Sequence, residues 1–218
     1  MSQRKLPNIL LTGTPGTGKT THASQLIEAL QALEIPAASS SSTETPAWET
    51  INVSEFVKAN DCHSGYNEEW DTYDVDEDKL LDELEIVQRK GGRILDWHTC
   101  DIFPERWIDL VVVLRCEHST LWTRLEKRGP RLQEGRARQE HLTSKFAPSR
   151  SGYTLNKIQE NNEAEIMQVV LQDARESYAE EIVVELTSEG PEDVEQNVAR
   201  IAAWIKAWLD DHPDGVDA

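Results

Sequence analysis

A glycine-rich segment near the start of the chain contains residue types that suit phosphate binding. Its eight residues match the pattern G-x-x-x-x-G-K-[ST] and read Gly13-Thr14-Pro15-Gly16-Thr17-Gly18-Lys19-Thr20. Glycines allow positive φ, so successive N–H groups can face phosphate oxygens, and a following helix adds its positive dipole end. In such a loop the lysine reaches the β and γ phosphates and the hydroxyl after it holds magnesium. The segment, with Thr21 beside it, therefore predicts a site for ATP and Mg²⁺.

Two further polar side chains follow an apolar pair in Arg93-Ile-Leu-Asp96-Trp-His98. We expect Asp96 to close a strand, where its carboxylate can hold magnesium or the water bound to it. A helix cap is the alternative role for this aspartate. His98 points to the same side if the strand continues, and its imidazole could orient a water or an incoming phosphate oxygen. A purely structural histidine is the alternative there.

Arg124 and Arg128 stand four residues apart, on one face of a predicted helix that ends at Gly129. Phosphoryl transfer needs positive charge around the moving group, because negative charge spreads over its oxygens. We therefore interpret both arginines as catalytic, with Arg128 also contacting the triphosphate. The alternative is that they are solvated surface residues.

The elements that must position these residues can be recognised from the apolar pattern. Asn8 to Thr12 reads as a strand that stops at glycine, and Thr20 to Leu33 has apolar residues at helical spacing. Further apolar runs alternate with helical patterns, namely Ile94-Leu95, Leu110–Leu114 and Ile182–Leu186. Such alternation predicts an α/β fold with a parallel sheet covered on both faces. We expect residues 1–218 to form one compact domain.

Composition limits the possible functions. The chain has 218 residues and a net charge of −18, which disfavours strong direct binding to nucleic acid. Residues 128–157 form a basic island, with 7 basic and 2 acidic side chains, where an anion is expected. Three distant cysteines suit a reducing compartment, and no apolar stretch is long enough for a membrane span. We expect a cytosolic or nuclear protein without a signal peptide. Two low-complexity segments, around residues 37–46 and 129–152, are expected to be mobile.

These motifs together resemble the adenylate kinase isoenzyme 6 family, also called coilin-interacting nuclear ATPase in animals and a ribosome-assembly ATPase in fungi. The resemblance covers nearly the whole chain apart from insertions at about 39–46 and 130–152. It rests on the glycine segment and on Pro7-Asn8-Ile9, Gly65-Tyr66, Val75-Asp-Glu-Asp78, Asp96-Trp-His98, Phe103-Pro-Glu-Arg-Trp107, Arg128-Gly129 and His212-Pro-Asp-Gly215.

The resemblance implies a P-loop fold of the nucleoside monophosphate kinase type. Its expected parts are a five-stranded parallel sheet flanked by helices, a monophosphate-binding region at 51–74 and a lid at 128–157 that carries the basic insertion. It also implies AMP contacts at Asn52, Val53, Ser54, Lys58 and Arg106. Lys58 stands where some members have arginine, so it keeps the charge but loses the bidentate grip. Structural zinc is not expected.

The implied function is adenylate kinase activity (ATP + AMP to 2 ADP) with ATPase activity. The family further implies a basic small-subunit ribosomal protein as partner, maturation of pre-40S particles, and a location in nucleus and cytoplasm. We expect a monomer. The alternative is an assembly factor whose ATP site is mainly a slow hydrolytic switch. A regulatory GTPase is disfavoured because Asn156-Lys157-Ile158-Gln159 lacks the aspartate that reads guanine. A dinucleotide fold is disfavoured because the glycine segment ends in Lys-Thr.

Overall fold

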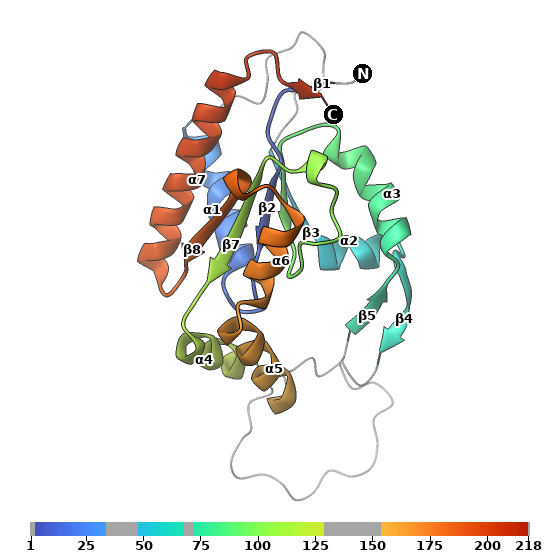
Figure 1. The fold of residues 1–218 in the computed structure, drawn as a ribbon, viewed down its shortest axis with the longest axis vertical. Helices are drawn as coiled ribbons and strands as arrows, with labels where there is room; N and C mark the ends of the chain where they lie inside the picture. The colour runs from blue at the N-terminus through green and yellow to red at the C-terminus, as the bar shows by residue number, and fades with distance from the viewer. Residues whose placement is uncertain (1–2, 34–47, 68–71, 129–153, 218) are drawn as a thin grey trace, which may run out of the picture.

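The structure, a computed structural model, describes residues 3–33, 48–67, 72–128 and 154–217. Its centre is a five-stranded sheet with the order β3-β6-β2-β7-β8, in which all neighbouring strands are parallel (Figure 1). This confirms the predicted α/β P-loop fold. The strands are β2 (Ile9–Thr12), β3 (Glu49–Asn52), β6 (Arg93–Asp96), β7 (Leu110–Arg115) and β8 (Val183–Thr187).

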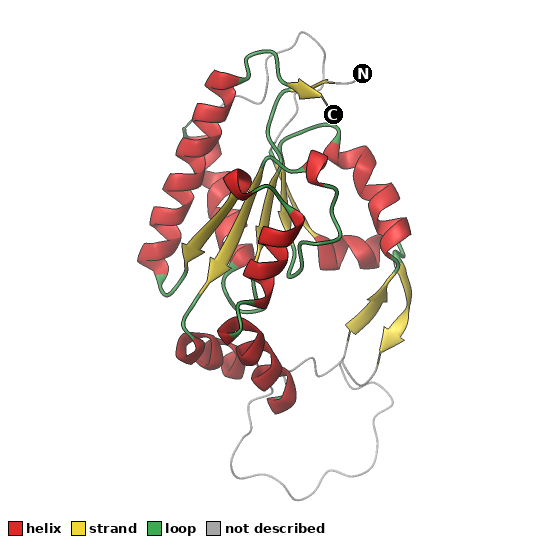
Figure 2. Cartoon of the chain, viewed as in Figure 1, coloured by secondary structure: helices red, strands yellow, loops and turns green. Residues whose placement is uncertain are grey.

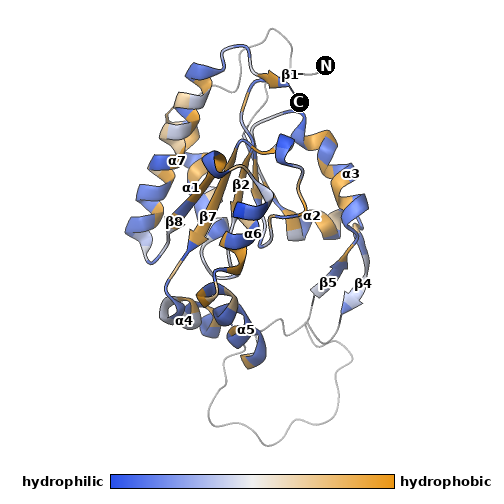
Figure 3. Ribbon diagram, viewed as in Figure 1, coloured by the Kyte–Doolittle hydropathy of each residue, from blue (hydrophilic) through white to orange (hydrophobic). Residues whose placement is uncertain are grey.

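Helices cover both faces of the sheet (Figure 2). Successive strand residues point to opposite faces, so the apolar runs feed two separate cores. Leu10 packs in one core, whereas Ile9 and Leu11 pack in the other. The hydropathy colouring of Figure 3 shows that these central strands are almost continuously apolar, as expected for strands buried on both faces.

The two cores have different helices against them. The first core includes residues of α2 (Val53–Ala59), α3 (Glu77–Gln88) and α6 (Val169–Ser177). The second includes residues of α1 (Lys19–Ala32) and α7 (Pro191–Asp211). The helix predicted at Thr20 to Leu33 is therefore confirmed by α1. The sequence pattern gave no prediction for α2 or α6.

At the carboxyl ends of the strands, α4 (His118–Arg128) packs against α5 (Leu155–Ile166). Their contact is a small third core made of Cys116, Leu121, Leu125 and Ile158. Two short 3-10 turns, Glu105–Trp107 and Glu180–Ile182, precede β7 and β8. The predicted helix ending at Gly129 corresponds to α4, whose last residue is Arg128.

Two small antiparallel pairs were not predicted. The hairpin β4 (His63–Asn67) and β5 (Thr72–Val75) lies beside α3. The second pair joins β1 (Gln3–Arg4) to β9 (Val216–Asp217), so the two ends of the described chain lie together. Arg4 forms an ion pair with Asp109 in addition.

Several expectations fall wholly or partly outside the described residues. The low-complexity segment at 37–46 and the basic insertion at 130–152 lie outside them, and so does most of the predicted lid at 128–157. Cys62, Cys100 and Cys116 are buried free thiols, as expected. Among the described helices, none is long and apolar enough to cross a membrane.

Candidate nucleotide site

The glycine segment forms a loop between β2 and α1, as predicted. Gly13 has φ 138°, and a Cβ atom there would lie 2.4 Å from the main-chain oxygen of Leu114, so no side chain fits. Gly16 and Gly18 also have positive φ, 102° and 97°. Gly18 caps α1, whose first residue is Lys19. The loop therefore has the shape that lets backbone N–H groups surround a phosphate.

Side chains behind the loop fix this shape. Thr17 Oγ1 donates to Thr14 O at 2.9 Å, and Ser188 Oγ donates to Thr17 O at 2.7 Å. The buried His22 ring lies 3.0 Å from Gly18 O through Nδ1 and 3.2 Å from the Asn197 amide through Nε2. The side chains of Thr14 and Thr17 are buried, so their hydroxyls are not available to a phosphate.

Lys19 extends along the loop towards the strand ends. Its Nζ donates to Gly13 O at 2.6 Å and to Thr14 O at 3.2 Å. Burial lowers the pKa of Lys19 from 10.5 to about 8, although the nearby carboxylate of Asp96 opposes the shift. A bound phosphate would restore the full charge, because an anion beside the ammonium favours its protonated form.

Asp96 ends β6, beside both strands that carry its partners. It pairs in register with Leu11 of β2 and with Asn52 of β3. One carboxylate oxygen accepts from Thr20 Oγ1 at 2.6 Å and from Asn52 Nδ2 at 3.1 Å. A hydroxyl and a carboxylate at this distance form the hard oxygen set that Mg²⁺ prefers. Thr20 and Asp96 therefore fit the predicted magnesium site.

A cavity of about 750 Å³ opens over the loop. It is lined by predicted nucleotide residues and by three residues of α5. The predicted ones are Pro15, Gly16, Gly18, Lys19, Thr20, Thr21, Asn52, Ser54, Asp96, His98 and Arg128. Those of α5 are Lys157, Glu160 and Asn161. None of these three was predicted as a site residue, although Lys157 lies within the basic island, which was the available signal.

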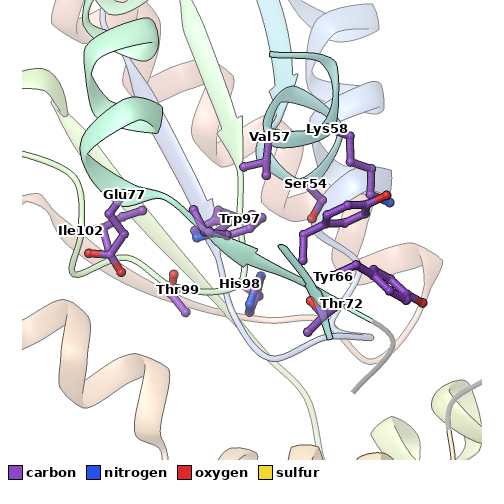
Figure 4. Close-up of a pocket in the computed structure, with 12 residues that line it drawn as sticks. Ser54, Val57, Lys58, Tyr66, Thr72, Glu77, Trp97, His98, Thr99 and Ile102 are labelled. Carbon is purple, nitrogen blue, oxygen red and sulfur yellow. The ribbon is translucent and has the colours of Figure 1, made fainter. Parts of the chain in front are cut away.

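A second cavity, of about 790 Å³, lies between α2, the β4–β5 hairpin and the segment after β6 (Figure 4). The two cavities share four lining residues, Ser54, Thr72, Trp97 and His98. They therefore meet at the ends of β3 and β6.

His98 lies where the cavities meet, with its ring centroid 4.3 Å from that of Trp97. Although its side chain faces the cavity, the surrounding protein lowers the pKa of His98 from 6.5 to about 4. Desolvation is the main cause and the charge of Lys19 adds to it, whereas Asp96 opposes both. At neutral pH the imidazole is therefore uncharged and can donate or accept one hydrogen bond at each nitrogen, according to its tautomer.

The second cavity has an aromatic wall with one cation. Lys58 Nζ lies 5.5 Å from the Tyr73 ring centroid, and Tyr66 packs edge-on against the same ring. Trp97 is buried, and its indole Nε1 has no hydrogen-bond partner among the described residues. Aromatic rings beside a lysine suit a flat, anionic ligand such as a nucleotide.

Some predicted contacts are placed elsewhere. Val53 is buried in the first core and lines neither cavity, so its side chain is not available to AMP. Arg106 is exposed, pairs with Glu85 of α3 and lines neither cavity. Its predicted AMP contact therefore has no support in the geometry, because the 3-10 turn after Pro104 directs it towards α3.

Arg124 and Arg128, which were both predicted to be catalytic, lie in different places. Arg128 lines the cavity over the loop, as predicted. Arg124 instead donates to Gly16 O at 3.3 Å and to Glu189 O at 2.9 Å, behind the loop. The structure thus places Arg124 as a brace between the loop and the segment after β8, and not among the cavity residues.

Comparison with known proteins relates this chain and its fold to others. Residues 9–143 match a family model described as AAA domain. The fold is similar to that of shikimate kinase from Bacteroides thetaiotaomicron, with a TM-score of 0.53 at 14% identity, over 92% of this chain and 99% of that one.

Curated relatives carry the name predicted from the motifs. The Adenylate kinase isoenzyme 6 homolog of Schizosaccharomyces pombe is 48% identical, over 96% of this chain and 98% of its own length. The Saccharomyces cerevisiae homolog is 46% identical, over 99% and 90% of the two chains. That of Dictyostelium discoideum is 41% identical, over 95% and 97%. Because these identities extend over nearly full length, the chain belongs to the adenylate kinase isoenzyme 6 family.

Proposed function

We propose that the protein transfers a phosphoryl group reversibly between ATP and AMP. The observation that carries the proposal is the pair of cavities that meet at His98 and Trp97. One cavity lies over the phosphate loop and suits ATP. The other, with its aromatic wall and Lys58, suits AMP. Two nucleotides bound in this way would place their phosphates towards the shared residues. Holding the two phosphates close together would itself lower the barrier to phosphoryl transfer.

The residues at the junction have separate roles in this proposal. Lys19 and the loop N–H groups hold the β and γ phosphates of ATP, and Arg128 adds positive charge from α4. When bound at Thr20 and Asp96, Mg²⁺ would neutralise charge on the phosphate oxygens. The uncharged His98 orients the AMP oxygen that attacks. That oxygen is already ionised at neutral pH, since the second pKa of a phosphate monoester is about 6, so no base is required.

A coupled assay of ADP formation tests the proposal. The purified protein is supplied with ATP and Mg²⁺, with and without AMP. We expect AMP to increase ADP formation strongly and to yield two ADP for each ATP consumed. If AMP gives no increase over ATP alone, the kinase proposal fails and hydrolysis by water is the remaining reaction.

A second function is supported by the distribution of charge. Exposed carboxylates gather on α3, at Glu77, Asp78, Asp82 and Glu83, and residues 158–218 contain 16 acidic and 3 basic residues. Such a surface suits a basic partner. We propose a basic small-subunit ribosomal protein, bound during maturation of pre-40S particles in nucleus and cytoplasm, with slow ATP hydrolysis as a switch. The protein would act as a monomer and would not bind RNA strongly by itself.

Pull-down of the candidate ribosomal protein, with and without ATP, tests this second function. We expect salt-sensitive binding that changes with nucleotide. Absence of binding in both conditions would exclude it. The two functions are compatible, because one ATP site can serve transfer to AMP and transfer to water.

A further inference from the structure

Glu165 is a buried carboxylate that the proposed mechanism does not use. It lies in the last turn of α5, with 3% of its surface exposed. One carboxylate oxygen accepts from Thr14 Oγ1 at 2.5 Å. The other accepts from Arg115 Nε and from the backbone N–H of Cys116 at 3.3 Å. Glu165 therefore joins the phosphate loop, the end of β7 and α5 at one point.

Glu165 lies on α5, the helix that forms one wall of the cavity over the loop. Asn161 and Lys157 precede Glu165 by one and two helical steps of four residues, so they lie on the same side of α5. Both line the cavity over the loop. Asn161 Nδ2 also donates to Lys157 O at 2.6 Å, which ties these two turns together. Because a hydrogen-bonded helix is rigid, fixing Glu165 fixes the distance of this wall from the loop.

The ion pair with Arg115 alone would explain a structural role, because a buried carboxylate needs a partner. Arg115 also donates to Glu165 O at 3.1 Å, which anchors the helix end by itself. The bond to Thr14 is the additional feature, since it reaches a side chain of the phosphate loop. The carboxylate also raises the pKa of Lys19, in the same direction as Asp96 and against Arg128.

We propose that Glu165 is a positioning residue that joins the phosphate loop to α5 through Thr14, and thereby holds Lys157 and Asn161 against the phosphates of the bound nucleotide. The inference rests on the proposed ATP site. It adds Lys157 and Asn161 as binding residues and predicts that the loop and α5 respond to nucleotide together.

Deletion of one hydroxyl tests the connection. Thr14→Val removes the donor to Glu165 and keeps the side-chain volume, whereas Thr14→Ser keeps the hydroxyl. Thr14→Ala repeats the deletion without a second branch. Thr123→Val is the matched control, because its hydroxyl only donates to Ser119 O one turn back on α4. Binding of the non-hydrolysable analogue adenylyl imidodiphosphate with Mg²⁺ is measured by titration calorimetry.

Combination with Lys157→Met separates positioning from stability. We expect Thr14→Val to lower the affinity for the analogue about tenfold, which corresponds to the loss of one hydrogen bond to a charged group. Thr14→Ser and Thr123→Val should change this affinity less than about twofold. Lys157→Met should lower the affinity for the analogue about tenfold in the unmodified protein. In a protein that already carries Thr14→Val, the same change should lower it less than about threefold. Contacts that depend on one another are not additive in this way.

Two results would overturn the inference: unchanged affinity in both Thr14→Val and Thr14→Ala, or fully additive effects of Thr14→Val and Lys157→Met. Hydrogen exchange without nucleotide gives a separate reading, since loss of the connection should speed exchange at the amides of α5. Unchanged exchange there would refute the connection itself. If the unmodified protein does not bind the analogue, the proposed ATP site fails, while the exchange result still decides the connection.

Discussion

Replacement of Arg124 discriminates between the role suggested by its spacing and the role suggested by its contacts. Its guanidinium bridges Glu189 O at 2.9 Å and Gly16 O at 3.3 Å. A hydrogen bond from a charged donor contributes about 1.5–3 kcal/mol, and the longer of these two bonds is the weaker. Because the side chain is only half-buried, we expect Arg124→Ala to lower the free energy of unfolding by about 2 kcal/mol. For a chain of this size, that lowers Tm by about 4–8 °C.

The kinetic effect should follow from the loop and not from the reacting phosphate. Release of Gly16 O loosens the loop, so we expect the KM for ATP to rise several-fold while kcat stays within about twofold. Arg124→Lys keeps the charge but cannot bridge both oxygens, so it should resemble Arg124→Ala. A direct catalytic role predicts the reverse, a loss of about 10²–10³ in kcat.

The assay combines thermal unfolding with steady-state ADP formation. Arg89→Ala is the matched control, because it removes an exposed arginine paired only one turn back with Glu85. Such pairs contribute about 0.3–0.5 kcal/mol, so its Tm should change by less than about 2 °C. An Arg124→Ala protein with unchanged Tm and a kcat reduced a hundredfold would refute the brace and restore the catalytic interpretation.

Four further outcomes follow from the site. Lys19→Met should abolish turnover without lowering Tm, because burial already disfavours the charge of Lys19; a lower Tm in thermal unfolding would contradict this. Asp96→Ala combined with His98→Ala should leave the circular dichroism spectrum intact and remove most activity, and full activity would refute both roles. The pKa of His98 is about 4 in the folded chain and ordinarily 6.5, so unfolding takes up a proton between these values. The free energy of unfolding should therefore fall as pH drops through that range, and His98→Gln, compared by urea denaturation, should reduce the fall. Trp97→Phe reduces a ring that lines both cavities and, because the other rings of this wall line only the second cavity, should raise the KM for AMP more than the KM for ATP; equal effects on both would argue against a role in the second cavity.

The phosphate loop and its sheet could be predicted because their signals are local. Gly13, Gly16 and Gly18 stand where the backbone needs positive φ, and the strands beside the loop contain short apolar runs. Asp96 could be found as well, since it ends such a strand. Its partner Asn52 came only from the family resemblance, because the contact depends on the pairing of β3 with β6.

The second cavity was harder to predict because its walls are not apolar runs. The β4–β5 hairpin contains half-exposed polar and tyrosine residues, and it is held by ring contacts such as that between Tyr66 and Tyr73. No periodicity marks it as a pair of strands. The aromatic residues that line the cavity were therefore missed, although Lys58 beside them was found.

The roles of Arg124 and Glu165 could not be predicted from the spacing of residues in the sequence. The partners of Arg124 lie 65 and 108 residues away, and both are backbone oxygens that leave no trace in the residue pattern. Glu165 is one carboxylate among 40 acidic residues of an acidic chain. Only its burial and its contact with Thr14, 151 residues away, distinguish it from its neighbours.

The pairing of β1 with β9 has a practical consequence for engineering. These strands lie at the end of the molecule opposite α4 and α5, and therefore far from the phosphate loop (Figure 1). A fluorophore or surface tether attached beside either strand would leave both cavities open. The same closeness would allow a short linker to join the two ends, so that a circularly permuted chain could open at another exposed turn. Such a permutant would show whether the sheet assembles independently of the order in which its strands are synthesised.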